Sequence, residues 1–166
     1  MKFLNEFGGE YDNIYVVGIT PVDNPCDFCR ENIDGKIFKL IEDPEKEPKN
    51  DIVNDPIFGK IHLIWPTKSY NKNNRWVRAD FQHVNCTCAF EFFDPLTSKY
   101  NSKTKSVELL SPTEMPDYTK RAYEYLLNKQ LNSEKRRLAI TKNKYRKHLR
   151  KININTLENY LKNLKK

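Results

Sequence analysis

The stretch NPCDFCRENIDGKIFKL, residues 24–40, decides how the first part of this chain folds. Two cysteines three residues apart, Cys26 and Cys29, are followed by an Asp-Gly-Lys triplet at residues 34–36. Asp-Gly is a common turn dipeptide, so we expect Gly35 to adopt a positive φ and to direct the chain into the next segment. That segment, residues 35–42, alternates apolar and polar side chains, which predicts a β-strand. The role of the cysteine pair depends on the two other cysteines.

Those cysteines stand together in FQHVNCTCAFEFF, residues 81–93, where one residue separates Cys86 from Cys88 and His83 precedes Cys86 by three positions. Two short chelating clusters far apart in sequence are typical of structural zinc sites, because the metal joins segments that would not otherwise meet. Thiolates favour zinc among the common divalent ions. We therefore predict a Zn²⁺ site formed by Cys26, Cys29, Cys86 and Cys88, with His83 as an alternative ligand.

Other uses of the cysteines stay open at this point. A thioredoxin-like redox motif places its Cys-x-x-Cys at a helix N-terminus within a βαβ unit, and no such pattern is visible around Cys26. Two disulfides, or thiols packed in the core, are further alternatives. We expect no secretory signal, because the N-terminus lacks an apolar segment, and hence a reducing environment in which metal binding is more frequent than disulfide formation. A closed site of four ligands builds structure and does not activate water, so we expect no enzymatic activity.

The remaining chain predicts an α+β fold. Residues 13–20, 57–65 and 89–93 are rich in β-branched and aromatic residues and predict strands. We expect a surface loop at residues 43–56, which hold three prolines, and an extended linker at residues 94–116. The predicted order is a small β-rich, zinc-stapled body (1–93), the linker (94–116) and a basic helical region (117–166), consisting of a long helix and a shorter C-terminal helix.

The helical region carries most of the positive charge. Residues 117–166 contain 15 Lys and Arg against 4 Asp and Glu, a net charge of +11, whereas the whole chain carries +7. The absence of Gly and Pro between Asp117 and Arg150 predicts one long helix there, followed by a shorter one capped by Asn155 or Thr156. An apolar seam is expected along Leu127, Leu131, Leu138, Tyr145, Leu149 and Ile152.

Such a charge excess predicts a polyanion or an acidic protein surface as partner, and a merely solvated helix face is the alternative. The mean hydropathy of −0.80 excludes a membrane protein. We expect neither a membrane nor a small-molecule partner. The basic residues expected to form the contact are Arg136, Arg137, Lys144, Arg146, Lys147, Arg150 and Lys151.

Taken together, the two cysteine clusters and the Asp-Gly-Lys triplet resemble the minor head proteins of tailed bacteriophages related to the F protein of phage Mu. The resemblance covers roughly residues 24–93, and Val84 and Thr87 depart from the usual Pro and Arg. It implies that Cys86 and Cys88 are both ligands, because relatives carry His in place of the last Cys. The matching residues are Cys26, Cys29, Asp34, Gly35, Lys36, Phe38, His83, Asn85, Cys86 and Cys88.

The resemblance also implies a structural role in the virion, near the portal or connector, with other virion proteins as partners and contacts to packaged DNA. Two further functions stay open. One is a zinc-containing nucleic-acid-binding protein. The other is a nuclease of the His-Asn-His type with residues 79–86 as its catalytic strand, although a second zinc knuckle and the downstream Asn/His helix are absent from the sequence.

Overall fold

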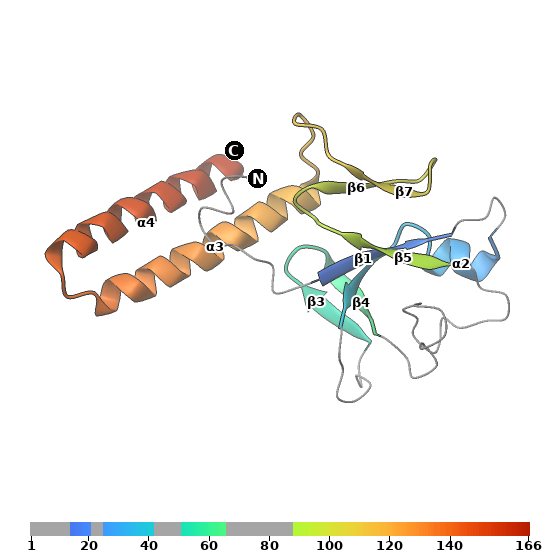
Figure 1. Cartoon of the computed structure of the whole chain (residues 1–166), viewed down its shortest axis with the longest axis horizontal. Coiled ribbons are helices and arrows are strands. Elements are labelled where there is room, and N and C mark those ends of the chain that lie inside the picture. The colour runs from blue at the N-terminus through green and yellow to red at the C-terminus, as the bar shows by residue number, and fades with distance from the viewer. Residues whose placement is uncertain (1–13, 21–24, 42–50, 66–87) are drawn as a thin grey trace. The chain divides into compact units, whose positions relative to one another are not determined.

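The protein is known from a computed structural model, which describes residues 14–20, 25–41, 51–65 and 88–166 (Figure 1). It divides into two compact units, one spanning residues 12–115 and the other containing residues 116–166. Strands make up the first unit and two long helices the second, so the predicted α+β class is confirmed. The first unit contains β1 (Ile14–Ile19), α2 (Asp27–Asn32), β2 (Ile37–Leu40), β3 (Ile52–Asp55), β4 (Gly59–Ile64), β5 (Ala89–Phe93), β6 (Ser98–Asn101) and β7 (Ser106–Leu109).

Five strands form one sheet in the order β3-β4-β2-β1-β5, in which β2 and β4 run parallel and the other neighbours antiparallel. In β1, Val16 packs in a core cluster with Phe38, while Tyr15 lies on the opposite face with its ring centroid 5.1 Å from that of Phe58. Successive side chains of a strand point to opposite faces of the sheet. β1 is therefore buried on both faces, which explains why its residues other than Gly18 are all β-branched or aromatic.

The loop predicted at residues 43–56 is wrong in part, because β3 occupies its last residues. Val53 pairs with Ile61 of β4, which supplies the backbone hydrogen bonds of this edge. Asp55, at the end of β3, has a buried carboxylate that accepts from the Tyr15 hydroxyl at 2.8 Å and from the backbone N–H of Ile57 at 2.8 Å. This carboxylate closes the turn into β4.

The extended linker predicted at residues 94–116 is also wrong, because β6 and β7 form an antiparallel hairpin there. The polar residues that suggest a linker are turn formers in the structure. Asp94 accepts a hydrogen bond from the N–H of Leu96 at 2.9 Å before β6, and Asn101 accepts one from the N–H of Lys103 at 2.9 Å in the turn to β7. Lys105 completes that turn with a φ of 52°.

In the second unit, α3 (Asp117–Ile140) and α4 (Lys144–Leu164) form a helical hairpin, so the single long helix predicted to Arg150 is wrong. The chain leaves the helix at Thr141 (φ −78°, ψ 122°) and re-enters it after Asn143. The Asn143 side chain accepts the N–H of Arg146 at 3.0 Å and caps α4. Asn155 and Thr156, the predicted caps, lie inside α4.

Packing of the two helices explains why the predicted seam is only half right. Leu127 and Leu131 of α3 pack with Ile154, Leu157 and Leu161 of α4, with Leu138 at the edge of this cluster. The interruption at residues 141–143 changes the phase of α4, so the later members of the predicted seam face solvent. Their side chains are exposed by 70% (Tyr145), 42% (Leu149) and 47% (Ile152).

Candidate functional site

Cys26 and Cys29 sit at the first turn of α2. Cys26 is the N-cap residue, and its Sγ accepts the backbone N–H of Cys29 at 3.4 Å. The N–H of Arg30 donates to the carbonyl of Cys26 at 3.0 Å and starts the helix. Cys26 is exposed, whereas Cys29 is buried on the inner side of α2. The predicted metal ligands of this cluster are thus held by one helical turn.

Local hydrogen bonds favour the thiolate of Cys26. The backbone N–H of Cys29 is the main reason that the pKa of the Cys26 thiol is lowered, and the side chain of Cys29 adds to the effect. Desolvation and the carboxylate of Asp27 oppose it. Thiolate is the form of cysteine that binds metals and attacks disulfides. This environment therefore suits a metal ligand, and it also suits a redox cysteine.

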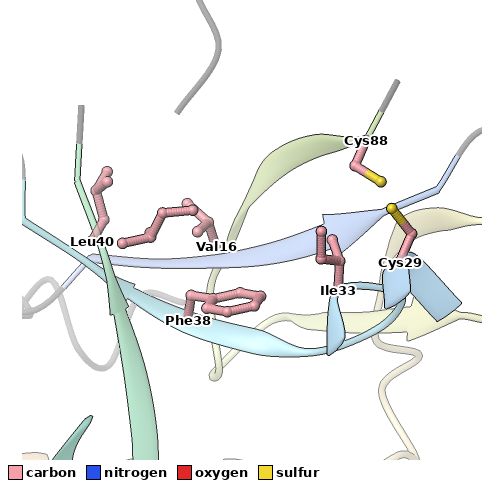
Figure 2. Packing of buried hydrophobic residues seen from close by; sticks show 7 residues of the cluster. Val16, Cys29, Ile33, Phe38, Leu40 and Cys88 are labelled. Carbon is pink, nitrogen blue, oxygen red and sulfur yellow. The ribbon is translucent and has the colours of Figure 1, made fainter. Parts of the chain in front are cut away.

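Cys88 belongs to the other cysteine cluster and lies directly before β5. Cys88 and Cys29 are 5% and 3% exposed and share one core cluster with Ile33 and Phe38. Figure 2 shows their sulfur atoms pointing toward one another. Pairing of β5 with β1 places Ala89 opposite Ile19, which brings the residue before β5 to the end of β1 where α2 follows. The fold thus brings together one cysteine from each of the two sequence clusters.

The predicted ligand set is only partly covered by the structure. His83 and Cys86 lie outside the described residues. Among the residues that are described, no three His, Cys, Asp or Glu side chains are grouped so as to hold a metal ion. The zinc site therefore stays a prediction. The other histidines lie elsewhere: His62 is exposed on β4, and His148 is exposed on α4.

One local feature of the redox alternative is present, since a cysteine caps a helix that follows a strand. The supersecondary context differs from that of a thioredoxin-like motif. Strands β1 and β2, which flank α2, pair antiparallel and are direct neighbours, so they form no βαβ crossover. The sequence-based expectation that no βαβ unit surrounds Cys26 is confirmed.

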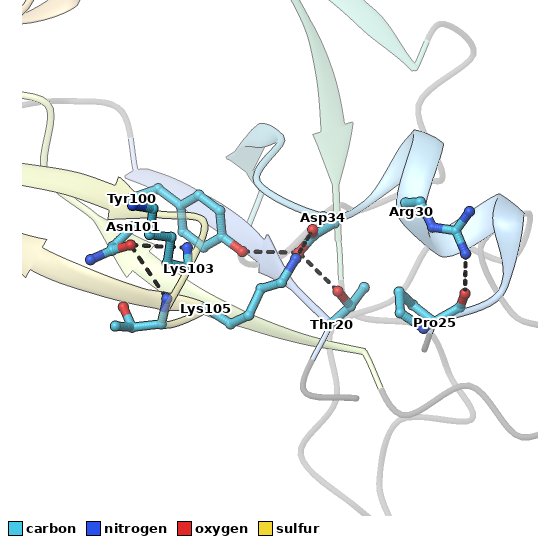
Figure 3. Close-up of polar contacts among 9 residues, drawn as sticks. Thr20, Pro25, Arg30, Asp34, Tyr100, Asn101, Lys103 and Lys105 are labelled. Carbon is cyan, nitrogen blue, oxygen red and sulfur yellow. Dashed lines mark hydrogen bonds and ion pairs between the residues drawn. The ribbon is translucent and has the colours of Figure 1, made fainter. Parts of the chain in front are cut away.

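A polar cluster forms where α2 ends, around the aspartate of the Asp-Gly-Lys triplet (Figure 3). Oδ1 of Asp34 accepts hydrogen bonds from Thr20 Oγ1 at 2.8 Å and from the Tyr100 hydroxyl at 2.9 Å. Its Oδ2 forms an ion pair with Nζ of Lys105. These donors come from the end of β1, from β6 and from the β6–β7 turn. A single carboxylate, 13% exposed, thus connects the sheet to the β6–β7 hairpin.

Electrostatics in this cluster favour the ionised aspartate. Burial acts to raise the pKa of Asp34, but hydrogen bonds from Lys105, Thr20 and Tyr100 outweigh it and hold the pKa below its ordinary value. The same contact acts on the phenol in the opposite sense. Burial and the hydrogen bond to Asp34 raise the pKa of Tyr100 to about 12. The cluster is therefore an ionised aspartate that binds two neutral hydroxyls and one lysine, and these contacts stabilise the fold.

Gly35 adopts the positive φ predicted from the sequence, with a value of 68°. A Cβ at Gly35 would lie 2.8 Å from Cε1 of Tyr100, so the position excludes a side chain on steric grounds as well. Its N–H donates to the carbonyl of Gly18 at 2.9 Å, and the N–H of Gly18 donates to the carbonyl of Lys36 at 2.9 Å. At Gly18 a Cβ would lie 2.2 Å from the carbonyl oxygen of Ile33. The triplet is therefore clamped against β1 by backbone contacts.

The seven basic residues singled out in the sequence fall into two groups. Arg150 of α4 forms an ion pair with Glu134 of α3 at 3.1 Å, which joins the two helices, and Arg137 pairs with the same glutamate within α3 at 3.4 Å. The other five are exposed, namely Arg136, Lys144, Arg146, Lys147 and Lys151. Sequence reasoning found neither this division nor the partners of Asp34, because no local pattern marks contacts between distant residues.

Comparisons with protein-family models, with curated proteins and with solved structures found no match. Within the described part of the chain, no helix combines the length and apolar character needed to cross a bilayer.

Proposed function

We propose that this chain is a non-enzymatic, zinc-stapled structural protein of a bacteriophage virion, associated with the head and its connector and docked on other virion proteins. The observation that carries the zinc staple is the meeting of Cys29 and Cys88 in one core cluster (Figure 2). One residue of each chelating cluster thus lies in the same core cluster, which supports a metal ion shared by the two clusters. The virion assignment is supported by the sequence resemblance alone.

Metal fits this position better than a disulfide framework does. The four cysteines fall in two pairs, so four thiolates are available for one tetrahedral ion. Cys26 already carries the N–H···S hydrogen bond that stabilises a thiolate. A body of roughly 100 residues buries only a modest core and gains much from a staple. With all positions filled by protein ligands, such a site builds structure and leaves no position for substrate.

Metal content of the purified full-length chain tests the staple. We expect about one zinc per chain by elemental analysis, and loss of zinc in Cys26→Ser and in Cys88→Ser. His62→Ala is the control, because this exposed histidine on β4 lies outside the predicted ligand set. His83→Ala decides the alternative ligand: retention of zinc assigns the site to the four cysteines.

Two outcomes would overturn the staple. The first is a parent protein without zinc after purification with zinc present. The second is a pair of cysteines that changes reversibly between dithiol and disulfide with no metal bound, which would favour the redox alternative. The virion role has its own test, which is detection of the chain in purified, nuclease-treated particles. Its absence from particles in which the portal protein is detected would refute that role.

A further inference from the structure

The connection between α3 and α4 carries a dense positive charge. Residues 135–157 contain nine Lys and Arg and no Asp or Glu. In the structure this segment covers the last turns of α3, residues 141–143 and the first two thirds of α4. We call residues 135–151, which hold all nine cations, the hairpin tip. The positive charge is concentrated at this end of the helical hairpin, because the three glutamates of the two helices lie outside residues 135–151.

Those glutamates already form ion pairs, and three of their four partners are cations of the tip itself. Glu134 pairs with Arg137 and Arg150, as described above. Glu158 pairs with Lys135 at 3.1 Å, and Glu124 pairs with Lys165 at 3.5 Å. Every glutamate of residues 117–166 thus has a basic partner within the hairpin. The three glutamate carboxylates are therefore not available to neutralise the remaining charge of the tip.

Six cations of the tip remain without an ion pair among the described residues, and all six are exposed: Arg136, Lys142, Lys144, Arg146, Lys147 and Lys151. Six like charges on one end of a hairpin repel one another, which costs free energy in the isolated protein. A polyanion that neutralises them and releases its own counterions recovers that cost and gains affinity.

The positions of these cations on α4 give the tip a two-sided form. Lys144, Lys147 and Lys151 are spaced i, i+3 and i+7 and share one side of the helix. Lys144 and Arg146 stand one residue before and one residue after Tyr145, so they lie about 100° to either side of it. The outward face around Tyr145, which is 70% exposed, is therefore bordered by positive charge on both sides.

We infer that the hairpin tip is a binding site for double-stranded nucleic acid, with the first half of α4 lying along a groove. The major groove is about 12 Å wide and admits an α-helix. Phosphates line both of its edges, which matches the lysine row on one side of α4 and Arg146 on the other. Arg136 and Lys142 extend the contact along the backbone. The inference rests on the proposed function in one respect, because a virion would provide packaged DNA as the duplex. The cations of the tip are present whether or not the protein binds a metal.

The six exposed cations of the tip outnumber its exposed large apolar residues, which favours a polyanion over a protein groove or an anionic membrane as the partner. A helix that inserts into either one presents a continuous exposed apolar stripe. On α4, Tyr145, Leu149 and Ile152 share one face at spacings of i, i+4 and i+7 and are 70%, 42% and 47% exposed, whereas Ile140, at 79% exposed, lies on the end of α3. This stripe is three residues long and cations border it on both sides, so the charge of the tip favours a polyanion as the partner.

Fluorescence anisotropy with a labelled 20-base-pair duplex of arbitrary sequence tests the inference on the full chain. Six phosphate contacts predict a slope of log K against log salt near about −5, and an affinity loss of about 10³-fold between about 50 and 200 mM salt. The triple variant Lys144→Gln, Lys147→Gln, Lys151→Gln should reduce the magnitude of the slope by about 3. A matched control, Lys162→Gln, Lys165→Gln, Lys166→Gln, removes the same charge at the other end of α4 and should leave the slope within about 1 of the parent.

Three results would overturn the inference. The first is no binding of the duplex by the parent at about 50 mM salt, and the second is an equal loss of duplex affinity in the two triple variants. The third is tighter association with anionic vesicles, or with an acidic protein such as calcium-loaded calmodulin, than with the duplex. Far-UV circular dichroism of each variant verifies that the helices are intact. Zinc content measured on the same samples separates the two proposals. If the protein contains zinc but does not bind DNA, only the inference is refuted. If the protein binds DNA but contains no metal, only the zinc staple is refuted.

Discussion

Replacement of Asp34 by alanine should destabilise the first unit by about 3 kcal/mol. The variant removes the acceptor of two hydroxyl hydrogen bonds, from Thr20 at 2.8 Å and from Tyr100 at 2.9 Å. A hydrogen bond to a charged group contributes about 1.5 kcal/mol or more when it is shielded from solvent. The ion pair with Lys105 adds less than about 1 kcal/mol, because the lysine side chain is 34% exposed.

Urea denaturation followed by tryptophan fluorescence reports on the unfolding of residues 12–115, because both tryptophans, Trp65 and Trp76, belong to this unit. With a slope of about 2 kcal/mol per molar urea, a loss of 3 kcal/mol moves the midpoint down by about 1.5 M. Asp27→Ala is the matched control. Its carboxylate is 87% exposed and forms an ion pair with the half-exposed Arg30, so the midpoint should move by less than about 0.5 M.

The pH dependence gives a second, independent readout of the same cluster. The folded-state pKa of Asp34 is lowered, so its contribution is complete above the unfolded-state pKa of about 3.9 and is lost as the pH falls through the folded-state value. The difference between the parent and Asp34→Ala should therefore be constant from pH 7 to pH 5 and shrink below about pH 4. A midpoint shift smaller than that of Asp27→Ala, or a difference that does not shrink in acid, would refute the assigned role of Asp34.

Two further substitutions test the turn and the hairpin. Gly35→Ala should destabilise the first unit by about 1–2 kcal/mol in the same urea assay, because it combines a positive φ of 68° with a Cβ placed 2.8 Å from the Tyr100 ring; an unchanged midpoint would contradict this conformation. Leu157→Ala should lower the free energy of unfolding of the helical hairpin by about 2–5 kcal/mol, because this side chain is 1% exposed between the helices. Far-UV circular dichroism measures this change. Leu149→Ala, at 42% exposed, is its control and should cost less than about 1 kcal/mol; equal effects would contradict the packing of α4.

The sequence predicted those strands whose stability depends on their own pattern. The alternation of residues 37–40 and the apolar run of residues 14–19 identified β2 and β1, because these side chains pack directly into the core. β6 was missed because its residues are mainly polar and show no alternation. Its place in the fold depends on Tyr100, whose hydroxyl binds Asp34 across 66 positions of sequence. No local pattern contains that information.

A similar limit explains the helices and the candidate site. Helix propensity is favourable through residues 117–150, but a capped interruption at Asn143 lets Leu131 and Leu157 pack together, and that gain depends on tertiary contact. For the cysteines, spacing predicted that two clusters meet, and the structure places Cys29 and Cys88, one from each cluster, in the same core cluster. Which side chains complete a site is decided in three dimensions, and the zinc site itself stays a prediction.

The short helix α2 links the two features that the opening stretch of sequence contains. A helix of six residues has little stability of its own, because the cost of nucleation is spread over few hydrogen bonds. Its first turn is held by Cys26 as N-cap and by the burial of Cys29 beside Cys88. Its last turn is held where the N–H of Asp34 donates to the carbonyl of Cys29 at 2.9 Å, and the Asp34 carboxylate binds the β6–β7 hairpin. Cys29 therefore contributes to both turns of α2. A metal bound at the cysteines and the hydrogen bonds of Asp34 would stabilise the same helix, so we expect their contributions to the free energy of unfolding to be non-additive.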